Sequence, residues 1–202
     1  MSRYTGPKQR LQRQIGEDLG LKTNGLKTAK RIDSRPGQHG AKNRRKLSNF
    51  GVQLKEKQKI KYIYGVMEKQ LKKVYELASK NPAATGSALL GFLERRLDNV
   101  VYRLGWAPTR AAARQLVNHS HVTVNGKKMN IASFRVQVGD IIVLKNQATK
   151  IPLVAELLKS EVESLPGWLE RKAAAGKVVR LPERIDIKEK LDEQLVVEYY
   201  SR

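Results

Sequence analysis

The chain has 202 residues, of which 40 are Lys or Arg and 19 are Asp or Glu, so its formal net charge is +21 at pH 7. It has no cysteine, which excludes a disulfide framework and a cysteine-ligated metal site. No apolar run approaches the length of a membrane span, and the start MSRYTGPKQR lacks the apolar segment of a signal peptide. We therefore expect a soluble chain that is not exported.

The positive charge is unevenly distributed. Residues 1–50 carry a net charge of +10, residues 51–100 carry +5 and residues 101–150 carry +7, whereas residues 151–202 carry −1. Such self-repulsion opposes folding unless a polyanion neutralises it, and nucleic acid is the commonest one. A basic membrane-surface protein usually shows an amphipathic helix with a bulky apolar face or a lipidation signal, and neither is evident. The charge distribution therefore predicts nucleic acid as the partner, and we expect no binding to a membrane.

Residues 1–50 read as a basic arm. The segment RPGQHGAKNRRK combines turn-forming residues with a basic cluster and is typical of an extended loop. A disordered solubilising tail is the alternative. Leu11, Ile15 and Leu19 have helical spacing, however, and predict a short helix inside an arm that its partner orders.

The segment Val52–Lys80 predicts helical structure. Apolar residues recur at helical spacing with lysines opposite, and Asn81-Pro82 ends the pattern. Gly65 inside the run is expected to divide it into two helices. The lysine face is either solvated or in contact with a polyanion, and its nearly uniform sign favours contact at least as much.

Ser87–Trp106 and Arg110–Asn118 predict two short amphipathic helices. The segment Gly105-Trp106-Ala107-Pro108 breaks the first, and Thr109 is well placed to cap the second. Each helix has a polar arc, and the fork of arginine and the amide of asparagine suit phosphates and base edges. The apolar arcs hold Leu97, Val100, Val101, Leu104, Ala112, Ala113, Leu116 and Val117, and the polar arcs hold Arg96, Asn99, Arg103, Arg110, Arg114, Gln115 and Asn118.

A β-hairpin follows this helix pair. Val122 and Val124 alternate with polar residues, and the strand turns at Asn125-Gly126, a strong hairpin signal. A further strand is expected at Asp140–Asn146. The predicted unit is two helices on a small sheet, with basic groups around it.

The segment RLDNVVYRLGWAPTRAAARQLVNHSHVTVNGKKMNIASF closely resembles the RNA-binding domain named after small-subunit ribosomal protein S4. RYTGPK, PGQHG, GVQLKEKQKIKYIYGVMEKQ and EQLVVEYYSR extend the resemblance to the S4 family of bacterial and organellar ribosomal proteins over nearly the whole chain; it is weakest across residues 145–180. The resemblance implies an α+β fold with a basic N-terminal arm at 1–44 and a mostly helical domain at 45–92, completed by the tail 181–202. The RNA-binding domain, two helices on a short, mostly antiparallel sheet, is inserted at 93–180.

The family also implies a function. The protein would be a structural constituent of the small ribosomal subunit that binds the 5′ domain of its rRNA, nucleates assembly and contributes to translational accuracy. Its partners would include ribosomal protein S5, other small-subunit proteins and mRNA where it enters the subunit, in the cytoplasm or in an organelle. The implied rRNA contacts are Arg3, Lys8, Arg35, His39, Lys42, Arg44, Arg45, Lys46, Lys55, Lys57, Arg96, Asn99, Arg103, Thr109, Arg110, Arg114, Gln115, His119, His121 and Lys127.

Two features depart from the family pattern. Many members bind zinc through N-terminal cysteines, which are absent here, so we expect no metal and no other cofactor. Relatives often complete a capping box with Glu at the position of Ala112, so the start of this helix should be slightly weaker, with its RNA face unaffected.

No residue predicts catalysis. The three histidines lack a partnered nucleophile or further metal ligands. Asp98 lies beside arginines and is expected in an ion pair, while Trp106 and Trp168 are expected in the core. The acidic residues between Glu183 and Glu198 are expected to form a solvated face or a protein contact.

Two other functions remain open. An RNA-modifying enzyme, such as a pseudouridine synthase, can carry the same RNA-binding module, but it needs a separate catalytic domain, for which these flanks are too short and too basic. A regulatory nucleic-acid binder, such as a repressor of its own message, is not excluded by the sequence.

Overall fold

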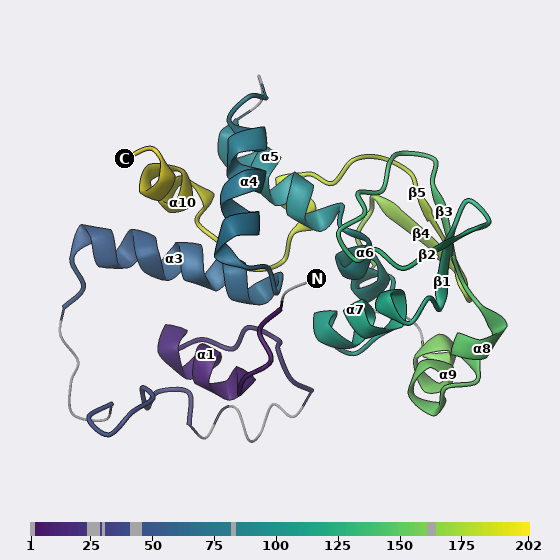
Figure 1. Cartoon of the computed structure of the whole chain (residues 1–202), viewed down its shortest axis with the longest axis horizontal. Helices are drawn as coiled ribbons and strands as arrows, with labels where there is room; N and C mark the ends of the chain where they lie inside the picture. The colour runs from purple at the N-terminus through teal and green to yellow at the C-terminus, as the bar shows by residue number, and fades with distance from the viewer. Residues whose placement is uncertain (1–2, 24–28, 30, 41–45, 82–83, 161–164) are drawn as a thin grey trace. The chain divides into compact units, whose positions relative to one another are not determined.

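A computed structural model of the chain describes residues 3–23, 29, 31–40, 46–81, 84–160 and 165–202. Helices and one antiparallel sheet confirm the predicted α+β class (Figure 1). The chain forms two compact units, unit 1 from Met1–Leu89 with Lys190–Arg202, and unit 2 from Leu90–Glu189.

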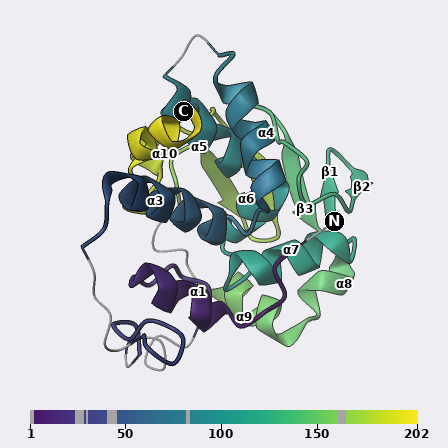
Figure 2. The ribbon, with the colours of Figure 1, turned by 60° about the vertical axis from the view of Figure 1, so that its left-hand side comes forward.

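Unit 1 is helical. It contains α1 (Lys8–Ile15), α3 (Asn49–Ile63), α4 (Glu68–Ala78), the start of α5 (Thr85–Glu94) and α10 (Glu193–Tyr200). Gly65, whose φ of +60° is in the left-handed region that glycine tolerates, separates α3 from α4, which confirms the predicted division. Figures 1 and 2 both show α10 alongside α3, where the rings of Phe50 and Tyr199 have their centroids 5.7 Å apart.

The short helix expected in the N-terminal arm is α1. Leu11, Ile15 and Leu19 are buried, so a fully disordered tail is wrong for this part of the arm. The side chain of Glu17 lies 2.6 Å from Lys59 Nζ on α3. The first turns of the chain therefore belong to the packed part of unit 1.

Unit 2 is built on a five-stranded antiparallel sheet of order β2-β1-β3-β5-β4. The strands are β1 (Val122–Val124), β2 (Lys127–Met129), β3 (Ile141–Leu144), β4 (Leu169–Lys172) and β5 (Ala175–Val178). The predicted hairpin is confirmed, since Asn125 and Gly126 both take positive φ angles between β1 and β2. The pair β4–β5 was not predicted.

The prediction of a single helix over Ser87–Trp106 was wrong, because α5 ends at Glu94 and α6 (Leu97–Arg103) begins after Arg96, whose backbone is extended. The helices α6 and α7 (Arg110–Asn118) share one core with the sheet. Trp106 and Trp168 are fully buried in that core, as predicted, and the Thr109 hydroxyl caps α7 by accepting a hydrogen bond from the Ala112 amide. The short helices α8 (Asn146–Thr149) and α9 (Pro152–Lys159) and the 3₁₀ turn η1 (Arg184–Asp186) complete the unit.

Candidate nucleic-acid interface

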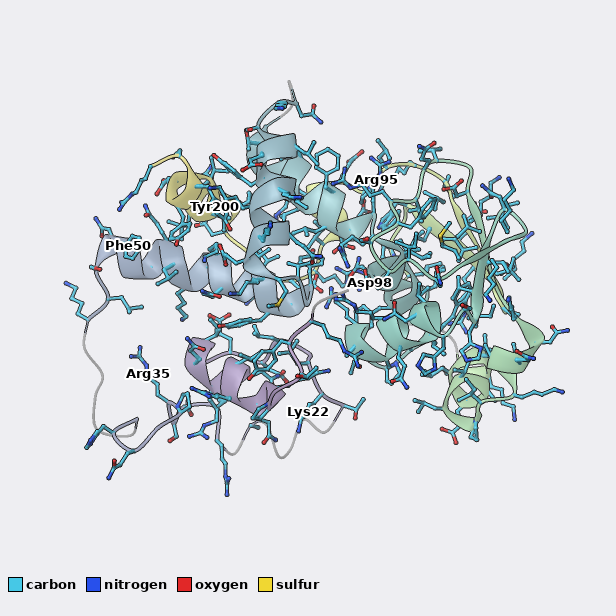
Figure 3. The ribbon with its side chains drawn as sticks, in the orientation of Figure 1. Lys22, Arg35, Phe50, Arg95, Asp98 and Tyr200 are labelled. Atoms are coloured by element: carbon cyan, nitrogen blue, oxygen red, sulfur yellow. The ribbon has the colours of Figure 1, made fainter. Side chains whose placement is uncertain are left out.

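The apolar arcs of α6 and α7 face the core of unit 2 as predicted. Leu97, Val100, Val101 and Leu104 have no exposed surface. At the start of α6, the guanidinium of Arg96 donates to both carboxylate oxygens of Asp98, at 3.1 and 2.7 Å. Figure 3 labels Asp98 on this helix. The ion pair expected for Asp98 is confirmed.

A second hydrogen-bond network links α6 and α7 to Glu94 and Glu189, which lie near the first and last residues of unit 2. Arg103 on α6 donates to both carboxylate oxygens of Glu94, at 2.7 and 3.0 Å, and to Glu189 at 2.7 Å. Arg110 on α7 donates to the other oxygen of Glu189 at 2.5 Å and to the Asn99 side-chain oxygen at 2.7 Å. Asn99 in turn donates to Glu94 at 2.7 Å. Glu189 therefore bridges two arginines on successive helices.

The charges in this network stabilise one another. Burial by itself would raise the pKa of Glu189, but the charges of Arg110 and Arg103, together with their hydrogen bonds, outweigh burial and lower that pKa to about 2. Burial likewise disfavours the charged form of Arg103, but Glu94 and Glu189 raise its pKa overall. Both groups remain charged at neutral pH.

Most members of the two polar arcs have little exposed surface. Arg96, Asn99 and Arg114 are buried, and the side chains of Arg103 and Arg110 are only 10% and 11% exposed. For Arg96, Arg103 and Arg110 the physical reason is that carboxylates compensate the buried guanidinium charges, which a helical wheel cannot show. These arginines hold α6 and α7 in place.

The exposed part of the predicted RNA surface lies on α7 and the hairpin. Gln115, His119 and Lys127 are exposed, while Thr109 and His121 are half-buried. The imidazole rings of His119 and His121 have their centroids 6.1 Å apart. These side chains are accessible to a ligand without rearrangement of the core.

The predicted rRNA contacts of unit 1 also include both exposed and half-buried side chains. Arg3, Arg35, His39 and Lys46 are exposed, and Lys8 and Lys55 are half-buried (Figure 3 labels Arg35). Lys42, Arg44 and Arg45 lie outside the described residues.

Lys57, expected on the lysine face of α3 and among the rRNA contacts, is buried. It is 3% exposed, its Nζ lies 2.9 Å from Glu68, and it stacks on the ring of Tyr199 with 4.7 Å to the centroid. The carboxylate and the ring on α10 stabilise the buried ammonium group. Lys57 therefore stabilises the packing of unit 1.

Three cationic side chains, Arg3, Lys8 and Lys22, lie near one another at the start of α1. Burial, followed by the nearby charges of Lys22 and Arg3, lowers the pKa of Lys8. The mutual repulsion of these cations would be relieved by an anion, as is typical of a phosphate-binding surface.

Sequence reasoning missed Glu94 and Glu189. The expectation that the acidic residues from Glu183 to Glu198 form a solvated face or a protein contact is wrong for Glu189, whose side chain is 21% exposed and bonded to two arginines. Glu94 lies five residues before Asn99 and nine before Arg103. This short separation was a weak indication that the three side chains could meet. Glu189 lies 79 residues from Arg110, and no local signal could have identified it.

In the part of the chain that the structure describes, no three His, Cys, Asp or Glu side chains gather as a metal site would require. None of the helices described there has the length and apolar character needed to cross a membrane.

Comparison with known families matches both parts of the chain. Residues 3–94 match the ribosomal protein S4/S9 N-terminal domain, and residues 95–142 match the S4 domain. The chain is thus a ribosomal protein of the RNA-binding class.

Full-length relatives identify the family. The chain is 47% identical to small ribosomal subunit protein uS4 of Parabacteroides distasonis and 48% identical to that of Chloroflexus aurantiacus, in each case over all of both chains. It is 51% identical to the protein of the same name from Methylobacillus flagellatus, covering all of this chain and 98% of the relative. The chain belongs to the uS4 family of small ribosomal subunit proteins.

Proposed function

We propose that the chain is a structural protein of the small ribosomal subunit that binds the 5′ domain of the rRNA directly and nucleates assembly of that domain. The full-length match to uS4 proteins carries this proposal. The net charge of +21, concentrated in residues 1–150, supports a polyanionic partner. The family is one of structural ribosomal proteins, so we propose no enzymatic activity.

The burial of individual side chains refines the proposed rRNA contacts. Exposed groups touch RNA directly: Arg3, Arg35, His39, Lys46, Gln115, His119 and Lys127, joined by the half-buried Lys8, Lys55, Thr109 and His121. Arg96, Asn99, Arg103 and Arg110 act mainly by fixing α6 and α7, with phosphate contact limited to their exposed edges. Arg114 is 5% exposed, so its contact with phosphate is limited in the same way. The basic stretch with Lys42, Arg44 and Arg45 completes the proposed surface.

Further partners follow from the family resemblance. We propose contact with ribosomal protein S5, with other small-subunit proteins and with mRNA where it enters the subunit, and through these a contribution to translational accuracy. The extended proposed surface, spread over both units, suits a ribosomal constituent better than a repressor of one message.

Sedimentation tests this proposal. The tagged chain, expressed in a bacterial host, should sediment with the small subunit through a gradient and remain bound at moderate salt. A variant with Arg3, Lys8 and Arg35 changed to Gln should be depleted from small subunits. The same change at Lys69, Lys72 and Lys73, which lie on the exposed side of α4 and are not in the proposed contact set, is the charge-matched control and should leave sedimentation unchanged. A wild-type chain found only at the top of the gradient would refute the proposal.

A further inference from the structure

A pocket of about 180 Å³ lies in unit 2 between α7 and the first turn of α9. Figures 1 and 2 both show these two helices as neighbours. From α7 the pocket is lined by Ala112, Gln115, Leu116 and His119, which have the three- and four-residue spacing of one helical stripe. Arg110 and Arg114 lie on a different side of the same helix, so the pocket is separate from the arginine network.

The floor of the pocket is apolar and firmly held. Trp106 is fully buried, Val154 is 3% exposed and Leu116 is 8% exposed. The Trp106 indole is fixed by a hydrogen bond from its Nε1 to the Ala173 carbonyl oxygen, at 3.1 Å. A ligand therefore meets a preformed apolar surface.

The rim of the pocket is polar but carries no acidic or strongly basic group. Gln115 and His119 are exposed and His121 is half-buried, and each can donate or accept a hydrogen bond. Among the described residues that line the pocket there is no Lys, Arg, Asp or Glu. The pocket suits an uncharged ring with hydrogen-bonding edges better than it suits a phosphate or a carboxylate.

The mouth of the pocket is exposed and lies next to positive charge. Leu153, in the first turn of α9, leaves 48% of its surface in water. Lys150 is exposed immediately before the lining residue Ile151. A ligand that presents an apolar ring face and is attached to an anionic backbone would cover the leucine and be attracted by the lysine.

We infer that this pocket binds one unstacked nucleobase of the RNA, with its ring over the apolar floor and its edge hydrogen-bonded by Gln115, His119 and His121. The inference rests on the proposed rRNA-binding function and adds a base-specific subsite to it. Proteins that read RNA commonly hold unstacked bases against apolar and aromatic side chains, histidine included, and hydrogen-bond their edges. A phosphate contact alone would carry no such base discrimination.

Uncharged nucleosides test the pocket without the general attraction of phosphates. The chain has only three histidines, so their imidazole proton resonances can be followed in the full-length protein by NMR. Titration with adenosine, guanosine, cytidine and uridine, one at a time, should give a saturable shift of His119 and His121 with at least one of them. His39, which lies in unit 1, serves as the internal control and should not move.

A matched pair of variants tests the pocket in RNA binding. Ala112→Leu fills the pocket from its wall, whereas Ala111→Leu adds the same atoms at the neighbouring exposed position. Ala112→Leu should lower the affinity for 5′-domain rRNA roughly tenfold, in the range expected for one stacked base, and leave the salt dependence unchanged. Ala111→Leu should bind like the wild type, and the buried tryptophans report whether both variants are folded.

Three results would overturn the inference. The first is that no nucleoside shifts His119 and His121. The second is that N-acetylphenylalaninamide, a mimic of an aromatic protein side chain, binds there more tightly than any nucleoside. The third is that folded Ala112→Leu binds rRNA like Ala111→Leu. In each case salt-sensitive rRNA binding by the wild type would leave the proposed function standing, whereas its loss would remove the proposed function itself.

Discussion

Replacing Glu189 by Gln removes the charge that bridges Arg103 and Arg110 while nearly preserving the size of the side chain. The pKa of Glu189 is lowered from 4.5 to about 2 in the folded chain. Each unit of difference between the folded and unfolded pKa corresponds to about 1.4 kcal/mol, so the charge contributes about 3 kcal/mol to folding at neutral pH. The free energy of unfolding of unit 2 should fall by that amount in Glu189→Gln.

The same difference in the pKa of Glu189 determines how the free energy of unfolding depends on pH. Because the folded pKa is lowered, this stabilisation is fully present above the unfolded pKa and is lost as the pH falls toward the folded value. The difference between wild type and Glu189→Gln should therefore be constant near neutral pH and shrink between about pH 4.5 and pH 2.

Urea titration followed by tryptophan fluorescence measures this effect in unit 2 alone. Both tryptophans of the chain, Trp106 and Trp168, lie fully buried in that unit. Glu183→Gln is the control, because the Glu183 side chain is 71% exposed and lies 3.6 Å from Arg180. If Glu189→Gln unfolded at the same urea concentration as the wild type at pH 7, or if the difference persisted unchanged at pH 2, the electrostatic account of the network would be refuted.

Three further substitutions test the packing of unit 2 by the same titration. Ala173→Gly should stabilise the chain by about 0.5–1 kcal/mol, since Ala173 takes a φ of +50°, which strains a residue with a Cβ. Gly176→Ala should destabilise it by about 1–3 kcal/mol, because the new Cβ would lie 2.6 Å from the Leu104 side chain. Thr109→Ala should cost about 1 kcal/mol through loss of the hydrogen bond that caps α7. An effect of opposite sign at any of these positions would contradict the local geometry described above.

Local sequence patterns predicted the features that local interactions determine. The division of α3 from α4 at Gly65, the cap at Thr109 and the hairpin at Asn125-Gly126 each depend on residues within a few positions of one another. The apolar arcs of α6 and α7 were predicted for the same reason, because helical spacing alone decides which side chains share a face.

Contacts between distant segments could not be read from such patterns. Whether a polar arc faces water or a buried carboxylate depends on Glu189, 79 residues beyond Arg110. Lys57 is buried because α10, at the other end of the chain, covers it with Tyr199. The strand pair β4–β5 was missed because Ala175, Gly176 and Lys177 give no clear alternation of apolar and polar residues, and the small Gly176 is required by the close approach of Leu104.

Direct binding of 5′-domain rRNA at increasing salt tests the central proposal most directly. If the exposed cations of both units neutralise several phosphates, the affinity should fall steeply, by roughly 10³-fold or more between 50 and 200 mM monovalent salt. The logarithm of the affinity should be linear in the logarithm of the salt concentration. An affinity that is nearly independent of salt, or that is the same for an unrelated RNA of equal length throughout the titration, would contradict a specific rRNA-binding role.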